Sequence, residues 1–345
     1  MTGQSNRRIV LAKRPTGLPG DDTFRLETSD VPEPADGEVV TKTIYLSLDP
    51  YMRGRLNDAP SYVPPVQIGE VMTGGTVSQV VASRLDGFAE GDIVVGHGGW
   101  QEFSTFKAKE ARKVDPAIAP ISTAVGVLGM PGHTAYGGLT QIGQPKAGET
   151  LVVAAASGAV GAIVGQIAKI EGCRVVGIAG GADKCAYIRD ELGFDEAVSH
   201  RDPDFPEKLK AACPDGIDIY WENVGGPVFD AVLPLLNPFA RIPVCGLIHW
   251  YNVTDIPTIP DPTPKLMRAV LVKRLRMQGF IVFDYQHLLD DFLSDISGWI
   301  RDGKLHYRED IRDGLENAPA ALNELLQGGN FGKMLISVAN DPKAS

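Results

Sequence analysis

A stretch of small residues, AASGAVGAIVG at 155–165, directly follows the apolar run LVVAA at 151–155. Small side chains let a backbone approach a pyrophosphate closely, and the first turn of a helix offers free N–H groups and the positive end of the helix dipole. We therefore expect a strand, a phosphate-binding turn with Ser157, Gly158 and Gly161, and a helix starting at Gly158. The alternative is tight strand–helix packing without a ligand.

A second position with chemical meaning lies about 20 residues further on, where an acidic residue binds the ribose 2′-hydroxyl in NAD sites. Counted from Gly158, this position falls on residues 178–181, a neutral corner that includes Gly180 and is followed by Asp183 and Lys184. A missing acid beside a cation favours a 2′-phosphate, and hence NADP(H). Lys184 would also suit an ordinary solvated helix surface.

Metal ligands and activated nucleophiles have little support. None of the four cysteines forms a CxxC pair, the six histidines have no helical partners, and residues 1–150 contain no cysteine. Catalytic zinc needs three protein ligands, so we predict no metal site. No GxSxG elbow is present. Unpaired cysteines also favour a reducing, cytoplasmic compartment.

The elements that would position these residues change character near residue 150. Before it, short strands separated by Pro- and Gly-rich connections are typical of a compact all-β or barrel-like unit: Val39–Leu46, Val71–Val81 and Asp92–Val95. After it, strands and helices alternate, which predicts a parallel doubly wound sheet. The predicted strands are Leu151–Ala155, Arg174–Ile178, Glu196–Ser199, Ile217–Trp221, Arg241–Cys245, Arg276–Val282 and Lys333–Val338. The predicted helices are the one from Gly158 and those at 182–192, 204–212, 226–236, Tyr285–Arg301 and Pro319–Gln327.

Size and charge narrow the class of protein. A chain of 345 residues with 43% apolar residues is long enough for two domains. Its net charge of −10 argues against nucleic-acid and anionic-membrane partners. Residues 151–168 carry no charge and contain a GxxxG, as a transmembrane helix would. Ser157 and Gly158 interrupt this run, and the N-terminus lacks a signal-peptide core, so we expect a soluble protein.

Seven stretches in a fixed order give a resemblance to a known family: LSLDPYMRGR (46–55), GVLGMPGHTAYGGL (126–139), GETLVVAAASGAVG (148–161), GIDIYWENVGG (216–226), CGLIHWYN (245–252), QGFIVFDY (278–285) and NFGKML (330–335). The chain resembles the zinc-independent medium-chain dehydrogenase/reductases. Within them it is similar to the branch of leukotriene 12-hydroxydehydrogenase/prostaglandin reductases, plant double-bond reductases and, nearest, bacterial NADPH-dependent curcumin reductases. The resemblance implies an α/β fold in which a Rossmann domain (131–302) is inserted in a GroES-like β-rich catalytic domain (1–130 and 303–345).

The resemblance also implies an activity, namely NADPH-dependent reduction of the carbon–carbon double bond of small α,β-unsaturated ketones and aldehydes. It implies catalytic roles for Tyr251 and Tyr51. With the turn and the glycine corner, the expected cofactor contacts are Ser157, Gly158, Val160, Gly161, Gly180, Lys184, His200, Asn223, Cys245, Tyr251, Phe280, Val282 and Asn330. The expected substrate pocket includes Tyr51, Tyr62, Met130 and Trp250.

The chain departs from the family pattern in three places. Many relatives have Asn-Tyr-Lys where this chain has Ser199-His200-Arg201. The tyrosine expected at the 2′-phosphate is therefore His200, and positive charge could come from Arg201. His249-Trp250 replace small polar residues before Tyr251, and His133 is unusual. We expect bulkier walls to change which enones fit.

Other functions remain open on the same scaffold. A zinc-independent quinone reductase or a secondary-alcohol dehydrogenase is one: the DPYMR and YN motifs weigh against the quinone reductase, and the missing zinc ligands weigh against the alcohol dehydrogenase. A non-catalytic, crystallin-like NADPH-binding protein is another, and a turnover assay would separate it. The apolar segment RMQGFIV (276–282) could pair with its copy at a sheet edge, which predicts a homodimer.

Overall fold

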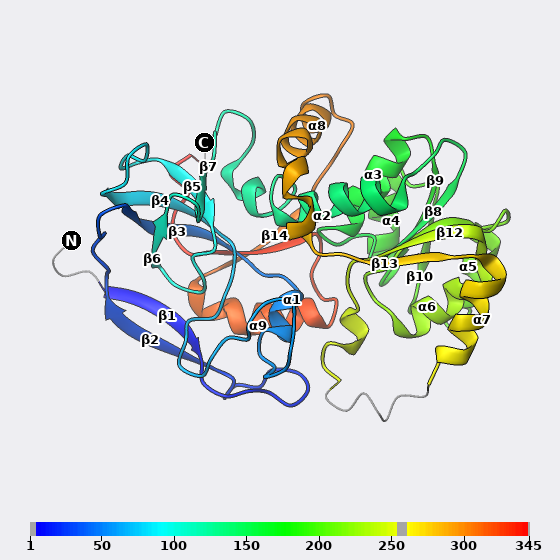
Figure 1. The fold of residues 1–345 in the computed structure, drawn as a ribbon, viewed down its shortest axis with the longest axis horizontal. Helices are drawn as coiled ribbons and strands as arrows, with labels where there is room; N and C mark the ends of the chain where they lie inside the picture. Colours follow the sequence, from blue (N-terminus) through cyan, green and yellow to red (C-terminus); the bar gives the residue numbers. More distant parts are fainter. Residues whose placement is uncertain (1–4, 254–260, 344–345) are drawn as a thin grey trace. The chain divides into compact units, whose positions relative to one another are not determined.

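The computed structural model describes residues 5–253 and 261–343 (Figure 1). The chain divides into two compact units, one formed by Met1–Gly129 with Glu309–Ser345 and the other by Met130–Arg308. Each unit has its own sheet. Within the described ranges, no helix has the length and apolar character that a membrane span requires.

The second unit is built on a six-stranded sheet in which all strands run parallel. The spatial order is β10-β9-β8-β11-β12-β13, which in chain order is the 3-2-1-4-5-6 arrangement of doubly wound dinucleotide-binding folds. The direction of winding reverses between β8 and β11. The strands are β8 (Thr150–Ala154), β9 (Arg174–Ala179), β10 (Glu196–Ser199), β11 (Ile217–Trp221), β12 (Leu236–Val244) and β13 (Arg276–Gly279).

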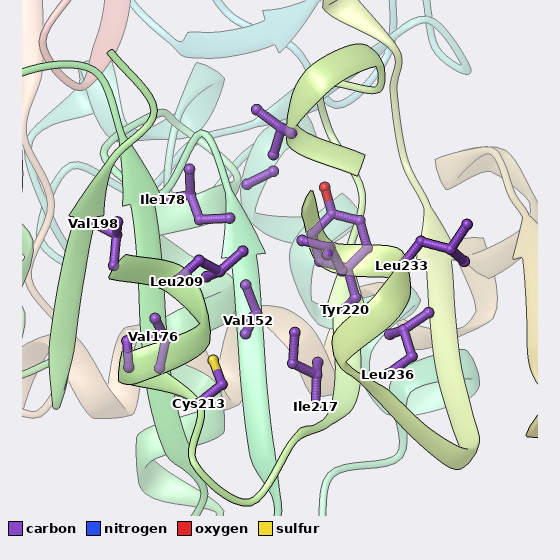
Figure 2. Close-up of a cluster of buried hydrophobic side chains, with 14 of the residues drawn as sticks. Val152, Val176, Ile178, Val198, Leu209, Cys213, Ile217, Tyr220, Leu233 and Leu236 are labelled. Carbon is purple, nitrogen blue, oxygen red and sulfur yellow. The ribbon is translucent and has the colours of Figure 1, made fainter. Parts of the chain in front are cut away.

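Helices cover both faces of this sheet. On one face, Gly165 of α3 lies so close to Phe194 that a Cβ at position 165 would be 1.9 Å from its ring. On the other face, Val152 and Ile178 of the sheet pack with Leu209 of α5 (Figure 2). The helices of this unit are α2 (Met130–Gly138), α3 (Gly161–Ile170), α4 (Ala182–Asp190), α5 (Phe205–Ala212), α6 (Gly226–Val232), α7 (Thr263–Lys273) and α8 (Leu289–Arg301).

The first unit is rich in strands. Its seven-stranded sheet has the order β14-β15-β3-β4-β5-β7, with β6 also paired to β3, and β1 pairs with β2 separately. The tail joins this sheet because β15 runs antiparallel to β3. The elements are β1 (Ser5–Leu11), β2 (Phe24–Asp30), β3 (Glu38–Ser47), α1 (Tyr51–Gly54), β4 (Thr76–Ser83), β5 (Ile93–Gly96), β6 (Phe103–Lys107), β7 (Ala111–Lys113), β14 (Glu309–Asp313), α9 (Ala318–Leu326) and β15 (Lys333–Ser337).

The parallel doubly wound sheet is confirmed, but several predicted boundaries are wrong. The strand placed at 71–81 starts at Thr76, and Val71 makes only an isolated bridge to Val10. The helix placed from Gly158 starts at Gly161, because the residues before it form the turn. The helix placed at 226–236 is formed by α6 and a 3₁₀ helix, η3 (Leu233–Leu235), but the strand placed at 241–245 already begins at Leu236. The strand placed at 276–282 ends at Gly279, and a 3₁₀ helix, η6 (Val282–Leu288), follows.

Candidate active site

The turn between β8 and α3 is compact and made from backbone. Ala155 adopts a left-handed conformation with φ of +52°. The Gly158 amide donates to the Ala155 carbonyl at 3.0 Å, and the Ala162 amide donates to the Gly158 carbonyl at 3.1 Å. A Cβ at Gly161 would lie 2.4 Å from the Ala155 oxygen. Glycine is therefore needed at 161 for the chain to turn into α3, whose first amides can then face an anion.

The reversal of winding between β8 and β11 is bridged by one side chain. The Asn223 amide nitrogen donates to the Ala154 carbonyl at 2.9 Å, so it ties the ends of the two strands together. The Trp221 indole N–H donates to the Asn223 side-chain oxygen at 3.1 Å, which sets the orientation of that amide. In open parallel sheets, ligands bind at the carboxyl ends of the strands at such a reversal. We call Ser157–Gly161 with Asn223 the switch point.

Glu222 holds the loop that follows β11. It is buried, and its carboxylate accepts hydrogen bonds from the Val224 amide at 2.6 Å, the Gly225 amide at 2.8 Å and the Tyr220 hydroxyl at 3.1 Å. Burial raises the pKa of Glu222, and the three hydrogen bonds oppose that rise. These contacts are all internal to the loop and its strand, so Glu222 has a structural role.

Tyr251 lies just after β12, in the loop beside the switch point. The amides of Cys245 and Gly246 donate to the Glu222 carbonyl at 2.9 and 3.1 Å, which joins this loop to β11. The Leu247 amide donates to the Tyr251 hydroxyl oxygen at 3.2 Å. A hydroxyl can accept and donate at the same time, and in this bond the Tyr251 hydroxyl is the acceptor.

The pair His249 and Trp250 packs on a glycine turn. Their rings meet edge to face with centroids 4.5 Å apart. A Cβ at Gly225 would lie 2.8 Å from the Trp250 indole nitrogen, and one at Gly226 would lie 2.4 Å from the His249 ring. Gly225 and Gly226 both have positive φ, so these two bulky residues occupy space that the glycines leave open.

Two other predicted residues have side chains committed to packing. The Phe280 ring is buried edge-on against Trp221, with centroids 5.7 Å apart. A ligand contact from residue 280 would therefore use its backbone. His133 Nε2 lies 2.9 Å from the Tyr285 carbonyl oxygen. Because a carbonyl oxygen only accepts, Nε2 donates this hydrogen bond. His133 also stacks on Phe292 at 5.1 Å, so this departure stabilises α2 against α8.

Met130 and Val282 begin elements of the second unit. Met130 is the first residue of α2, where its carbonyl accepts from the Thr134 hydroxyl at 2.7 Å. Val282 is the first residue of η6 and is partly exposed. Cys245 has its thiol pKa raised to about 12, chiefly by burial and further by the charge of Glu222.

A cluster of nitrogen-bearing side chains surrounds the corner after β9, and we call Gly180, Gly181, Lys184, His200 and Arg201 the cationic corner. His200 Nδ1 donates to the Ala179 carbonyl at 2.8 Å. A Cβ at Gly180 would lie 3.0 Å from His200 Cε1 and 3.2 Å from Arg201 Nε. Desolvation lowers the pKa of His200, and the charges of Arg201 and Lys184 lower it further. The donor set is therefore suited to an anion of more than one charge.

The first unit holds the remaining predicted residues. Tyr51 opens α1, and the pKa of its hydroxyl is held far above its usual range by burial and then by the charge of Asp49. Tyr62 is 54% exposed. The Asn330 side chain donates to the Gly332 carbonyl at 2.8 Å. These three residues belong to the first unit.

Arg55 is a candidate that the sequence analysis missed. Its Nε and Nη1 atoms are buried, and no described residue accepts a hydrogen bond from them. Arg53, two residues earlier, instead donates to the Gly17 carbonyl and the Asn57 side chain. The motif YMRGR contains both arginines, and nothing in the sequence separates the structural one from the unsatisfied one. An acceptor on a ligand would satisfy Arg55.

No group of three or more His, Cys, Asp or Glu residues that could hold a metal occurs among residues 5–253 and 261–343. The residues at the switch point and the cationic corner do fit a dinucleotide. The switch point supplies backbone amides at a helix start, and the corner supplies cations where an NAD site has a carboxylate. This donor set fits NADP(H).

Comparison with known proteins agrees with this geometry. Residues 7–114 match a family described as the N-terminal domain of oxidoreductase, and residues 159–297 match one described as zinc-binding dehydrogenase. The chain is 57% identical to the NADPH-dependent curcumin reductase of Escherichia coli (strain K12), over 98% of both chains. It is 41% identical to the NADP⁺-dependent 2-alkenal reductase of Nicotiana tabacum, also over 98% of both chains. The structure of CurA in complex with NADPH from Vibrio vulnificus is 54% identical with a TM-score of 0.93, and the match covers 97% of this chain and 100% of that chain.

Proposed function

The chain belongs to the double-bond reductase branch of the medium-chain dehydrogenase/reductases, and we propose that it reduces the carbon–carbon double bond of α,β-unsaturated ketones and aldehydes with NADPH. The observation that carries this proposal is the 57% identity to an NADPH-dependent curcumin reductase over 98% of both chains. The cationic corner supports it, because cations stand where an NAD site would have an acid.

The proposed cofactor contacts fall into three groups. At the switch point, the backbone of Ser157–Gly161, with Val160, would hold the pyrophosphate. At the cationic corner, Gly180 would admit the adenosine ribose, and Lys184 and His200 would bind the 2′-phosphate. Beside the nicotinamide and its ribose we place Asn223, Cys245, Tyr251 and the backbone of Phe280 and Val282, and Asn330 is a further proposed cofactor contact.

NADPH, when bound, supplies a hydride to the β-carbon of the enone. Negative charge then develops on the carbonyl oxygen, and a hydrogen-bond donor aimed at that oxygen lowers the barrier. We assign this role to the Tyr251 hydroxyl, acting directly or through a ribose hydroxyl, because Tyr251 follows β12 in the loop at the carboxyl end of the parallel sheet, where ligands bind in such folds. A hydroxyl donates a hydrogen bond through its own proton, so this role needs no neighbouring base.

Tyr51 is the second proposed catalytic side chain. Burial and the Asp49 charge keep its hydroxyl protonated, so it can donate a hydrogen bond or deliver a proton to the α-carbon. Tyr62, Met130 and Trp250 are the proposed walls of the substrate pocket. Arg55, whose buried nitrogens lack acceptors among the described residues, adds a donor close to Tyr51 in sequence.

We also propose that the protein is a homodimer formed through β13. Among the described strands, β13 pairs with β12 alone and is the edge of its sheet, so a second copy could extend the sheet. The nearby helix α7 exposes Leu271 at 76% and Met267 at 59%, more apolar surface than a solvated helix needs. Sedimentation of the wild type and of Gln278→Pro tests this, because proline cannot donate to a strand partner.

A cytoplasmic location is proposed on the state of the thiols. All four cysteines are free, and Cys173 and Cys213 are buried. Free thiols of this kind persist in reducing compartments. Fractionation of cells that produce the protein would check the location, and recovery outside the cytoplasm would contradict it.

The activity is tested by following NADPH oxidation with a panel of enals, enones, quinones and secondary alcohols. The proposal expects turnover with enals and enones and a saturated product. Turnover confined to quinones or alcohols, or cofactor binding without any turnover, would overturn it.

A further inference from the structure

Arg201 presents a guanidinium to the cationic corner. Its Nε lies 3.2 Å from the position that a Cβ would take at Gly180, and its Nη1 lies 4.0 Å from the corresponding position at Gly181. Its backbone amide donates to the Ser199 hydroxyl at 3.2 Å, and the Gly181 amide donates to the same hydroxyl at 3.3 Å. Ser199 therefore ties the chain segment of Arg201 to the glycine corner.

No carboxylate neutralises this guanidinium within the described residues. The next residue, Asp202, is paired with Lys208 at 2.7 Å. Arg201 itself has no ion pair in the part of the chain that the structure describes. A guanidinium that faces a glycine corner, beside Lys184 and without a protein anion, has the chemistry of a phosphate-binding group.

His200 has a defined tautomer in this corner. Because the Ala179 carbonyl only accepts, His200 Nδ1 carries a hydrogen and donates it at 2.8 Å. The neutral ring then has a lone pair on Nε2 and cannot donate from that nitrogen. The protonated ring gains an Nε2–H donor and a positive charge, so its ability to bind an anion depends on protonation.

We infer that Arg201 is a specificity-determining residue for the 2′-phosphate of NADPH, and that His200 makes this recognition proton-linked by donating to the phosphate only when protonated. The inference rests on the proposed NADPH dependence and extends it. The two residues that replace the tyrosine and lysine of many relatives thus supply a cation that is always charged and a donor that pH controls.

The sign of the pH dependence follows from the charges around His200. Arg201 follows it in the chain, Lys184 faces it from α4, and no carboxylate is among the groups that shift its pKa in the described structure. Desolvation and these cations hold the pKa of free His200 below its usual value. A bound phosphate raises that pKa again. The His200 contribution is therefore full below the pKa of the free protein and is lost as pH rises through the pKa of the complex.

The phosphate itself also titrates, with a second pKa near about 6. Its charge falls at low pH, which works against the His200 contribution. A variant that keeps the bond to Ala179 but cannot be protonated separates the two effects. His200→Asn has an amide that can donate to a carbonyl and has no titration in this range, so it reports the phosphate alone.

The test measures binding without turnover, by calorimetry with adenosine 2′,5′-bisphosphate, 5′-AMP, NADPH and NADH, from about pH 5.5 to 8. Arg201→Ala should weaken the two 2′-phosphorylated ligands by about tenfold and leave 5′-AMP and NADH unchanged. Arg189→Ala, which removes the same charge from the last turn of α4, is the matched control and should bind all four ligands as the wild type does.

For His200, the same titrations are repeated in buffers of different ionisation enthalpy near about pH 6.5. The wild type should take up more protons on binding adenosine 2′,5′-bisphosphate than His200→Asn does, and 5′-AMP should show no such difference. His200→Tyr should keep a neutral donor and lose the extra proton uptake. As pH falls, the ratio of NADPH affinity to NADH affinity should rise, and this rise should be larger in the wild type than in His200→Asn.

Two results would overturn the inference. One is an Arg201→Ala protein whose affinity for adenosine 2′,5′-bisphosphate stays within twofold of the wild type. The other is equal proton uptake by the wild type and His200→Asn. Enone turnover with NADPH alongside either result would leave the proposed function standing. If the expected proton uptake is found but the protein reduces no enone, the inference about Arg201 and His200 stands and the proposed function fails.

Discussion

The switch point and the cationic corner lie at the ends of neighbouring strands of one sheet, yet they are built in opposite ways. The switch point is neutral and consists of the backbone turn at 157–161 and the uncharged Asn223 side chain, with Gly161 in a position that admits no Cβ. The cationic corner presents the side chains of Lys184, His200 and Arg201 around Gly180 and Gly181. The first arrangement suits the pyrophosphate that all dinucleotides share, and the second suits the phosphate that distinguishes NADPH from NADH.

The largest effect should come from Tyr251, in the loop beside the switch point, because we assign it the hydrogen bond to the carbonyl oxygen during hydride transfer. Tyr251→Phe removes the donor proposed to support the carbonyl oxygen, so kcat with a short enone should fall by roughly 10²–10³. NADPH affinity should change little, because the phosphate contacts lie elsewhere. A deuteride isotope effect must show that hydride transfer limits the rate. If kcat then stays within threefold of the wild type, Tyr251 is not the donor, and Tyr51 becomes the candidate.

Gly161→Val tests whether the switch point serves both cofactors alike. A side chain at 161 would meet the Ala155 carbonyl oxygen at 2.4 Å, so the turn must shift. Overpacking of this kind costs about 1–3 kcal/mol, and we expect NADPH and NADH to lose affinity together by about 10- to 100-fold. Gly298→Ala on α8, where the nearest atom is a flexible Arg301 nitrogen at 3.8 Å, is the control. A loss confined to NADPH would contradict the comparison.

Lys184→Ala tests the cationic corner separately from Arg201. Loss of one charge-assisted hydrogen bond should weaken NADPH by ~1.5–3 kcal/mol and leave NADH nearly unchanged. Because Lys184 is partly exposed, the lower end of this range is expected at physiological salt. Dissociation constants for both cofactors check the result. Equal efficiency of NADPH and NADH in the wild type would already show that the corner does not discriminate.

The smallest effect is expected from chelators. Residues 1–150 contain no cysteine, and the described residues hold no cluster of three metal-ligating side chains. EDTA or phenanthroline should therefore leave both kcat and cofactor preference intact. Metal analysis of the purified protein accompanies the assay, and one zinc per chain that is lost together with activity would contradict the prediction.

Much of the second unit was predictable because its strands are short, apolar and regularly spaced. Val152, Val176, Ile219 and their neighbours are buried on both faces of a parallel sheet, and such strands read as continuous apolar runs. The switch point was predictable for the same reason, since small residues directly followed one of these runs. The early start of β12 was not, because Pro234, Pro238 and Pro243 lie beside or within it and suggest a turn.

The first unit was harder to predict, because its strands carry many charges. In β1, Arg7 and Arg8 interrupt the apolar pattern, and both are partnered by acidic side chains, Glu102 and Glu27. Because these acidic partners are distant in the sequence, the residues around Arg7 and Arg8 do not indicate that a strand forms there. The same limit applies to the candidate site. Arg55 and Arg201 follow recognisable motifs, but whether their guanidinium groups have partners depends on which residues the fold brings near them.

The reactivity of the cysteine thiols matters in a protein whose substrates are electrophiles. Enals and enones are electrophiles that add to thiolates. Burial is the first cause of a raised thiol pKa at all four cysteines, reaching about 11 for Cys173 and about 12 for Cys213 and Cys245. A thiol with a pKa of about 12 is ionised in roughly one molecule in 10⁵ at pH 7. Cys245, beside the proposed nicotinamide position, therefore has little thiolate at neutral pH and is a poor nucleophile toward an enal or enone.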